Sequence, residues 1–211
     1  MVCRDKGIQM HVDATAVLGQ WFFRFDDLLI DYLTFDGALL HGVEGMGGIL
    51  MHQNTPFHPW IAGDGGQNLS GLSALTVALT EAFNGFEQFH LEVARLRALF
   101  EKEIQALIPD ARVLFPLAER LPHITAISFP GADSEALLYL LSRKKVYASI
   151  GGGQTQKLAH VLTATGVDDL TAQCALSFGL SLETTEQEIL YAVQVIAESV
   201  KLLRRCSQGG V

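Results

Sequence analysis

Short apolar runs that end in a polar residue or a glycine turn organise the N-terminal part of this chain. Runs of this kind are typical of buried parallel strands, whose carboxyl ends carry functional groups into a crevice. The pattern predicts strands at Ile8–Ala14, Ile30–Phe35 and Gly45–Met51. The first two end near Asp13 and Asp36, so a catalytic or binding group is expected at these strand ends.

Helical spacing follows in the middle of the chain. Asn68 or Ser70 can cap a helix through Ala74–Phe83, and a longer helix is predicted at Phe86–Leu107. The acidic side chains of Glu101 and Glu103 are interpreted as a solvated face of this helix. Apolar residues at helical spacing should form the buried stripe of the longer helix: Phe89, Val93, Leu96, Phe100, Ile104 and Leu107.

The last part of the chain alternates strand and helix signals. The expected order is strand Ile124–Phe129, a helix through Leu141 capped by Asp133 or Ser134, strand Val146–Ile150, helix Thr155–Thr163, strand Ala175–Leu180, and a helix from Thr184 or Thr185 to Leu203. The fold class is therefore α/β in the first part and α+β in the second. The expected domains are 1–84 and 109–211, joined by a connecting helix over 85–108.

Composition narrows the class of protein. Apolar residues make up 49% of the 211 residues and charged residues 18%, which is typical of a globular chain. The net charge is −8, and the only basic clusters are Arg143–Lys145 and Arg204–Arg205, which argues against a nucleic-acid or anionic-membrane partner. The three cysteines fit a reducing compartment, and no apolar run is long enough to span a membrane, so we expect a soluble cytoplasmic protein.

Four segments in the same order resemble one family. Cys3–Ala14 is similar to a helix end followed by the strand motif HVDA, and Leu33–Gly47 to the motif SFSGHKxxGPKGxG. Gly65–Gly71 resembles a shortened GGGQExxxRSGT segment, and Ser177–Glu188 resembles RFSLG followed by TTEEEI. These motifs are those of the cysteine desulfurases, class V aminotransferases that depend on pyridoxal phosphate (PLP). The resemblance implies PLP fold type I, truncated to the end of the large-domain sheet plus an α+β small C-terminal domain.

The resemblance also assigns the family's PLP-binding roles to positions of this chain. Asp13 matches the acid that pairs with the pyridine nitrogen of PLP. The Gln that contacts the phenolic oxygen falls at Ala16, and the phosphate-binding Thr falls at Leu72. The Schiff-base Lys falls at Leu39 and the preceding His at Ala38, so the amine that carries the cofactor is replaced by an alkyl group.

Other catalytic positions of the family are also replaced. No lysine occurs between Lys6 and Lys102. The loop that carries the persulfide-forming Cys aligns with Ile150–Gln156, which contains no cysteine, and the Arg that binds the substrate carboxylate falls at Ser177. The rest of the family's PLP site is expected to precede Met1. The resemblance therefore predicts no PLP chemistry by this chain alone.

Simpler structural interpretations stand beside these assignments. Asp13 can equally cap a turn, and Leu39 and Leu72 can be core or interface packing residues. The glycines of 151–153 are interpreted as a flexible loop, since a P-loop pattern is absent. A metal site is imaginable from His41, His52, His58 and Asp13, but this spacing fits metal ligands poorly and no metal is expected.

Three hypotheses for the function follow. The leading one is a cysteine desulfurase-like homologue without catalysis of its own. The second is one part of a split PLP-dependent desulfurase or aminotransferase, completed by another chain that supplies the missing half and a lysine. The third is a non-catalytic interaction partner of an active desulfurase. The expected partner is a second copy of this chain or a related desulfurase chain.

Overall fold

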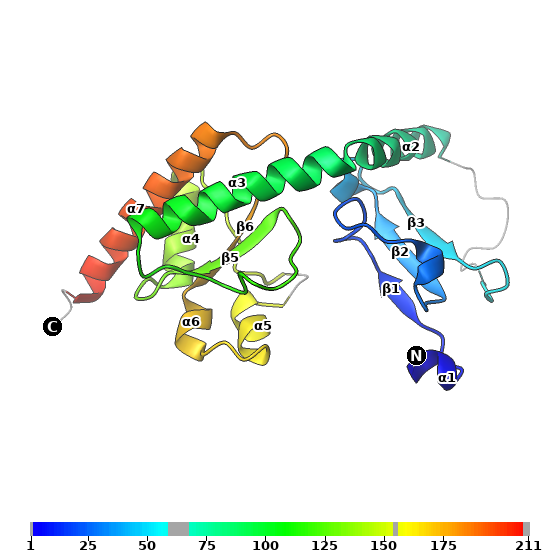
Figure 1. The fold of residues 1–211 in the computed structure, drawn as a ribbon, viewed down its shortest axis with the longest axis horizontal. Helices are drawn as coiled ribbons and strands as arrows, with labels where there is room; N and C mark the ends of the chain where they lie inside the picture. Colours follow the sequence, from blue (N-terminus) through cyan, green and yellow to red (C-terminus); the bar gives the residue numbers. More distant parts are fainter. Residues whose placement is uncertain (1, 59–67, 154–155, 209–211) are drawn as a thin grey trace. The chain divides into compact units, whose positions relative to one another are not determined.

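The computed structural model describes residues 2–58, 68–153 and 156–208. The chain divides into two compact units, unit 1 over Met1–Gln88 and unit 2 over Phe89–Val211. The helix α3 (Phe86–Leu107) begins in unit 1 and continues into unit 2 (Figure 1).

Unit 1 contains a three-stranded sheet. Its strands lie in the order β1 (His11–Asp13), β2 (Tyr32–Asp36) and β3 (Gly47–Met51). The parallel pairing predicted for the first two strands is confirmed, and β3 pairs antiparallel with β2. The strands are shorter than predicted, and the expectation that they are buried is wrong for β1. Because β1 lies at an edge of the sheet, His11 and Asp13 remain exposed.

Short helical turns connect these strands. They are α1 (Val2–Asp5), η1 (Phe25–Asp27) and η2 (Ala38–Leu40). The helix end that the resemblance places in Cys3–Ala14 lies before Gly7, which has a φ of 63°, and the Ile8 N–H donates to the Cys3 carbonyl at 2.8 Å. This left-handed residue ends the helix and turns the chain into β1.

The helix α2 (Leu69–Asn84) belongs to unit 1 and packs closely on the turns of this unit at several glycines. Asn68 is its N-cap, accepting from the Gly71 N–H at 2.9 Å, which decides between the two predicted caps. A Cβ on the facing glycines would contact the helix side chains at van der Waals distance or closer, in the pairs Gly37 with Leu75, Gly42 with Ala78 and Gly19 with Ala82. The glycines therefore allow the close approach of this helix to the turns beneath it.

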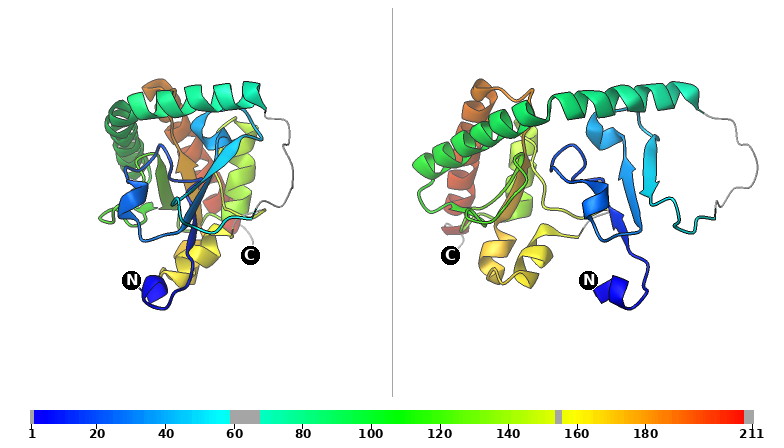
Figure 2. Two further views of the ribbon diagram at one scale, coloured as in Figure 1. Left: turned by 90° about the vertical axis from the view of Figure 1, so that its right-hand side faces the viewer. Right: turned by 45° about the vertical axis from the view of Figure 1, so that its right-hand side comes forward.

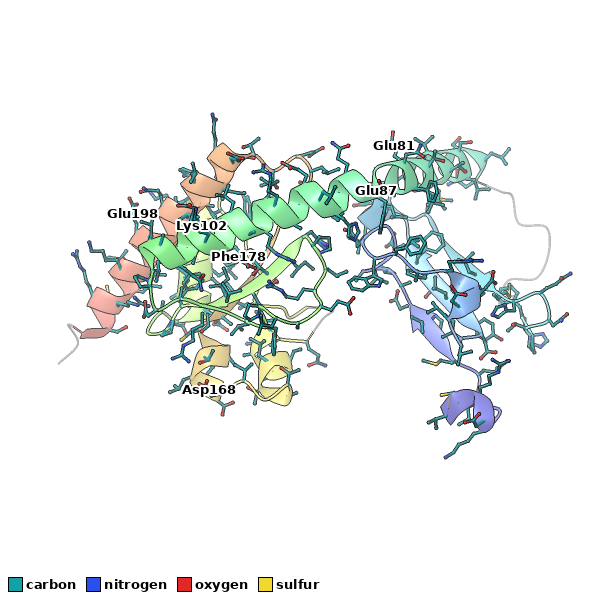
Figure 3. All side chains as sticks on the ribbon, in the orientation of Figure 1. Glu81, Glu87, Lys102, Asp168, Phe178 and Glu198 are labelled. Carbon is teal, nitrogen blue, oxygen red and sulfur yellow. The ribbon has the colours of Figure 1, made fainter. Side chains whose placement is uncertain are left out.

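Unit 2 is a three-stranded antiparallel sheet with helices on both faces (Figures 1 and 2). Alternate strand residues such as Leu176 and Phe178 join the main core, while Ala175 joins a smaller one. Phe178 lies 5.1 Å from Phe100 of α3, ring centre to ring centre (Figure 3). The strands are β4 (Arg112–Val113), β5 (Ile124–Ser128) and β6 (Ala175–Gly179). On one face of the sheet, α4 (Ser134–Arg143) and α7 (Glu186–Gln208) pack beside α3. The opposite face carries α5 (Leu158–Ala164) and α6 (Asp169–Gln173).

The buried stripe of α3 is confirmed over most of its length. Val93, Leu96, Phe100 and Ile104 are buried, and Phe89 is half-buried. The prediction is wrong for Leu107, which is 50% exposed. The helix ends at Leu107, and Ile108 enters the core in its place with 4% exposed.

Two local predictions in unit 2 differ from the structure. The segment 146–150 forms no regular strand, and Ser149 makes only an isolated bridge to Ser177. The helix α6 was not predicted; Asp168 caps it by accepting from the Thr171 N–H at 2.9 Å. Of the two predicted starts of the last helix, Thr185 is the cap, because it forms a capping box with Glu188 through reciprocal bonds.

Candidate functional site

Asp13 lies where β1 ends, at the position the sequence predicts for a cofactor-binding acid. Its Oδ1 accepts from the Thr15 N–H at 2.9 Å, which closes an Asx turn. Hydrogen bonds from Thr15 hold the pKa of the Asp13 carboxyl below its usual value, with a smaller contribution from the charge of His11. The His11 ring is itself hydrogen-bonded to Thr34 of β2 at 2.8 Å. The carboxylate is thus ionised and fixed by its own turn.

Leu39 lies on η2, directly after the end of the neighbouring parallel strand β2. The turn is held by Asp36, whose Oδ1 accepts from the Ala38 N–H at 2.8 Å, and by His41, which closes it in the left-handed region with a φ of 59°. Leu39 is 54% exposed and Leu72 is 44% exposed. Their interpretation as core side chains is therefore wrong, while the interface interpretation stays a prediction.

The segment Ile150–Gln156 lies in unit 2, and its residues 154 and 155 are outside the described ranges. Its two ends are tied together, since the Leu158 N–H donates to the Ile150 carbonyl at 2.7 Å and Gly151 bridges Lys157. Gly151 has a φ of 71°, and a Cβ there would lie 2.2 Å from the Gln156 carbonyl oxygen. The base of this loop therefore requires glycine at this position.

Ser177 lies on β6, where it exchanges two backbone hydrogen bonds of 2.8 Å with Ser149. The resemblance gives this position to the family's carboxylate-binding Arg, and a hydroxyl cannot make the bidentate, charged contact that an Arg makes with a carboxylate. Asp13 and Leu39 belong to unit 1, whereas this segment and Ser177 belong to unit 2.

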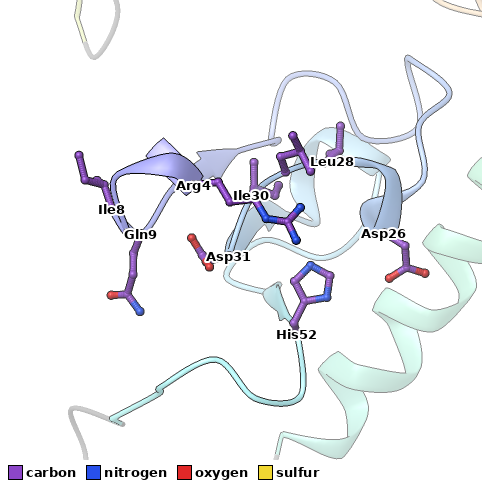
Figure 4. Close-up of a pocket in the computed structure, with 10 residues that line it drawn as sticks. Arg4, Ile8, Gln9, Asp26, Leu28, Ile30, Asp31 and His52 are labelled. Atoms are coloured by element: carbon purple, nitrogen blue, oxygen red, sulfur yellow. The ribbon is translucent and has the colours of Figure 1, made fainter. Parts of the chain in front are cut away.

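A cavity of about 410 Å³ lies near the start of β1, at the end opposite to Asp13 (Figure 4). Arg4 and His52 line it together with Asp26 and Asp31, whose Oδ2 accepts from the Met10 N–H at 2.7 Å. These groups could hold a small polar molecule. None of the positions that the resemblance singles out in unit 1 lines this cavity.

A charged cluster in unit 2 was missed from the sequence. Glu101, predicted as solvated, exposes only 15% of its side chain and accepts from Arg120 at 3.0 Å and Thr125 at 2.6 Å. Arg97 lies one helical turn away, with its Nε 3.8 Å from the same carboxylate. The spacing of Arg97 and Glu101 is the one signal in the sequence that could have indicated the pair. The prediction of a solvated Glu101 is therefore wrong.

The imagined metal site gains no support from the geometry. In the part of the chain that the structure describes, no three His, Cys, Asp or Glu side chains gather as metal ligands. The His52 ring instead packs on Phe25, with ring centres 4.7 Å apart. A search of the described residues for a helix long and apolar enough to cross a membrane also finds none.

Solved structures of similar proteins identify the fold class of this chain. The structure of a NifS-like protein matches 95% of this chain and 55% of its own length, with a TM-score of 0.82 and 28% identity. A NifS-like protein from Rickettsia africae covers 96% of this chain with a TM-score of 0.78 and 20% identity, which supports the fold alone. The fold is therefore that of PLP fold type I, here as about half of such a chain, and the fold prediction is confirmed.

Sequence comparison gives the family. A cysteine desulfurase of Nostoc sp. is 30% identical over 220 residues, covering 97% of this chain and 54% of the relative. The cysteine desulfurase NifS of Azotobacter vinelandii is 30% identical over 214 residues, covering 96% of this chain and 53% of the relative. No protein-family model matches. The chain is a homologue of the cysteine desulfurases, matches their C-terminal portion, and spans about half the length of these curated relatives.

Proposed function

We propose that this chain is a cysteine desulfurase-like homologue that cannot carry out PLP chemistry by itself. The observation that carries the proposal is the exposed alkyl side chain of Leu39, at the position that the resemblance gives to the Schiff-base lysine. An alkyl group has no lone pair with which to attack the aldehyde of PLP. The lysine nearest to Leu39 in the sequence is Lys6. It lies before the start of β1, whereas Asp13 lies at the end of this strand.

The remaining residues do not fit covalently held PLP either. Asp13 could still face a pyridine nitrogen, and we retain it as the one candidate for cofactor contact. Ala16 and Leu72 offer no hydrogen bond to the ring or the phosphate. Since burial of the cofactor's charged groups requires partners for them, a non-covalent complex through Asp13 alone should be weak.

The site for a sulfur-transferring group is also altered. The described part of Ile150–Gln156 carries glycines and a glutamine, and the full segment has no thiol. With Ser177 in place of the carboxylate-binding Arg, the chain lacks both the group that would accept sulfur and the one that would orient a substrate carboxylate. Catalysis by this chain is therefore proposed to be absent rather than slow.

Absorbance spectroscopy tests this proposal. Mixing the purified chain with PLP and then desalting it should leave no aldimine band near ~420 nm, and adding cysteine should release no sulfide. The Leu39→Lys variant is the matched comparison, because a stoichiometric band in the variant alone assigns the loss to the missing amine. A retained band together with sulfide release by the unaltered chain would contradict the proposal.

A two-chain enzyme is the second candidate, supported by the chain's match to only 54% of its relative. A polypeptide that supplies the N-terminal portion and a lysine would complete the site. Co-expression with the N-terminal portion of a related desulfurase tests this, with cysteine-dependent sulfide release as the supporting result and its absence as the contrary one.

We further propose that the chain acts by association, as a homodimer or together with a related desulfurase chain, as a non-catalytic partner. Residues 1–84 would correspond to the C-terminal part of the large domain, 85–108 to the connecting helix and 109–211 to the small domain. The described cysteines are free, which suits the cytoplasm as the proposed location.

A further inference from the structure

The cavity near the start of β1 collects polar side chains from separate segments of unit 1 (Figure 4). Arg4 belongs to α1, Asp26 to η1, Asp31 directly precedes β2, and His52 directly follows β3. All four lie in one compact unit, so their arrangement does not depend on unit 2. A concave site in which a few polar groups converge is the usual form of a small-molecule site.

The charges around this cavity are not paired with one another. Within the described part of the chain, Arg4 forms an ion pair with neither Asp26 nor Asp31, although all three line the same space. Figure 4 shows the Arg4 guanidinium pointing toward the His52 ring. A guanidinium offers only donors and a carboxylate only acceptors. The cavity is therefore complementary to a ligand that carries acceptors and donors side by side.

Two of the polar side chains are held in place by the protein itself. The Asp31 Oδ2 accepts from the Met10 N–H at 2.7 Å, and the Asp31 N–H donates to the Met10 carbonyl at 2.9 Å. The His52 ring is packed on Phe25. Because these contacts exist without a ligand, binding costs less ordering of these side chains.

Aliphatic side chains complete the lining of the cavity. They are Ile8, Leu28, Leu29 and Ile30. Ile8 and Leu29 expose 53% and 46% of their surfaces, so apolar area remains open to a ligand. A planar heterocycle meets both kinds of lining, since its edges are polar and its faces are apolar. An inorganic ion would leave the aliphatic side chains uncovered, and a hydrocarbon would leave the charged ones without partners.

Among common heterocycles, guanine fits these groups best. Its O6 and N7 accept a bidentate contact from an Arg, and its neighbouring edge donates N1–H and N2–H to a carboxylate. Asp26 has both carboxylate oxygens without a partner in the residues that the structure describes. We propose that this cavity binds a guanine nucleoside, with Arg4 on O6 and N7 and Asp26 on N1–H and N2–H. The second carboxylate, Asp31, disfavours a phosphate on the ligand.

Titration calorimetry of the full chain with nucleosides tests the proposal. Guanosine should bind with a dissociation constant below ~0.1 mM. Inosine lacks the N2 amine and should bind at least ~10-fold more weakly, since part of the carboxylate is then left without a donor. Adenosine has no N1–H and carries an amine in place of O6, so it should not bind measurably. Guanosine monophosphate should bind no more tightly than guanosine, because its phosphate adds negative charge near Asp31.

Substitutions at the two contacts should change the specificity as well as the affinity. Arg4→Met and Asp26→Asn should each weaken guanosine binding at least ~10-fold, because each removes one of the two paired edges. Asp26→Asn should instead bind xanthosine, whose O2 accepts from the new amide while N1–H still donates to its oxygen. Arg24 and Asp27 provide matched controls, since they pair with each other at 3.9 Å and do not line the cavity. Arg24→Met and Asp27→Asn should leave guanosine binding unchanged.

Three results would overturn the guanine site. They are the absence of saturable guanosine binding up to ~1 mM, equal affinities for guanosine, inosine and adenosine, and an unchanged guanosine affinity in the Arg4→Met and Asp26→Asn variants. Circular dichroism of each variant checks that it is folded, and xanthosine binding by Asp26→Asn is a gain that unfolding cannot produce. The titrations contain no PLP, so their outcome is independent of the proposed loss of PLP chemistry.

Discussion

At the scale of residues, His123 shows how tertiary packing changes the chemistry of one side chain. It follows β4 at the edge of the Glu101 cluster, and its Nδ1 is buried without a hydrogen-bond partner in the described parts of the chain. Burial lowers the pKa of His123, and the positive charges of Arg97 and His90 lower it further. The folded protein therefore favours the neutral imidazole.

Stability should fall as the pH drops below the unfolded pKa of about 6.5, because the unfolded chain then binds a proton that folded His123 takes up only at lower pH. This loss levels off once the pH passes the folded pKa. His123→Phe should remove this part of the pH dependence while keeping the contact with Phe89. Denaturant unfolding of both proteins at about pH 8 and about pH 5.5 measures it. An equal decline in the two proteins would refute the role of His123.

At the scale of elements, α3 separates what helical spacing can predict from what it cannot. Ile104 and Leu107 are both apolar and lie three residues apart, a spacing that is typical of a buried helical stripe. Ile104 is fully buried, whereas Leu107 is half exposed at the last turn. The difference arises because the chain leaves the helix there and Ile108 takes the core position.

Truncation of these two side chains should therefore have unequal effects. Ile104→Ala should reduce the free energy of unfolding by about 2–5 kcal/mol, since it leaves a cavity in the core of unit 2. Leu107→Ala should change it by less than about 0.5 kcal/mol, as at other exposed positions. Urea unfolding gives both values, and comparable losses would show that Leu107 is buried in solution.

At the scale of the whole molecule, the two units differ in their cores. The buried cluster of the unit 1 sheet is built on Ala14, Ile30 and Leu33. The main cluster of unit 2 joins α3, α4 and α7 to β5 and β6, and includes large side chains such as Phe129 and Ile196. Because burial of apolar area provides most of the stability, unit 2 should be the more stable part.

Hydrogen exchange should show this difference. Amides of β2 should exchange at least ~10-fold faster than those of β5, because local opening costs less where fewer apolar groups are buried. Mass spectrometry of peptides from Tyr32–Asp36 and Ile124–Ser128 measures the ratio. Equal protection of the two strands would contradict the prediction that unit 2 is the more stable part.

The sequence by itself determined much of the local structure of this protein. The bounds of α3, the end of the first helix at Gly7 and the capping box of α7 follow from side-chain spacing and backbone preference, which act over a few residues. The motifs also indicated the fold and the family, since they lie in the family's order.

Only the tertiary structure decided which of these residues are buried and which groups meet. Glu101 joins Arg120 and Thr125, and Leu39 and Leu72 stay exposed, because burial depends on what packs against a residue from elsewhere in the chain. The sequence also shows that α2 is apolar almost all round. Only the structure shows that Leu75 and Ala78 face the glycine turns, since spacing alone does not tell which face of an apolar helix the core occupies.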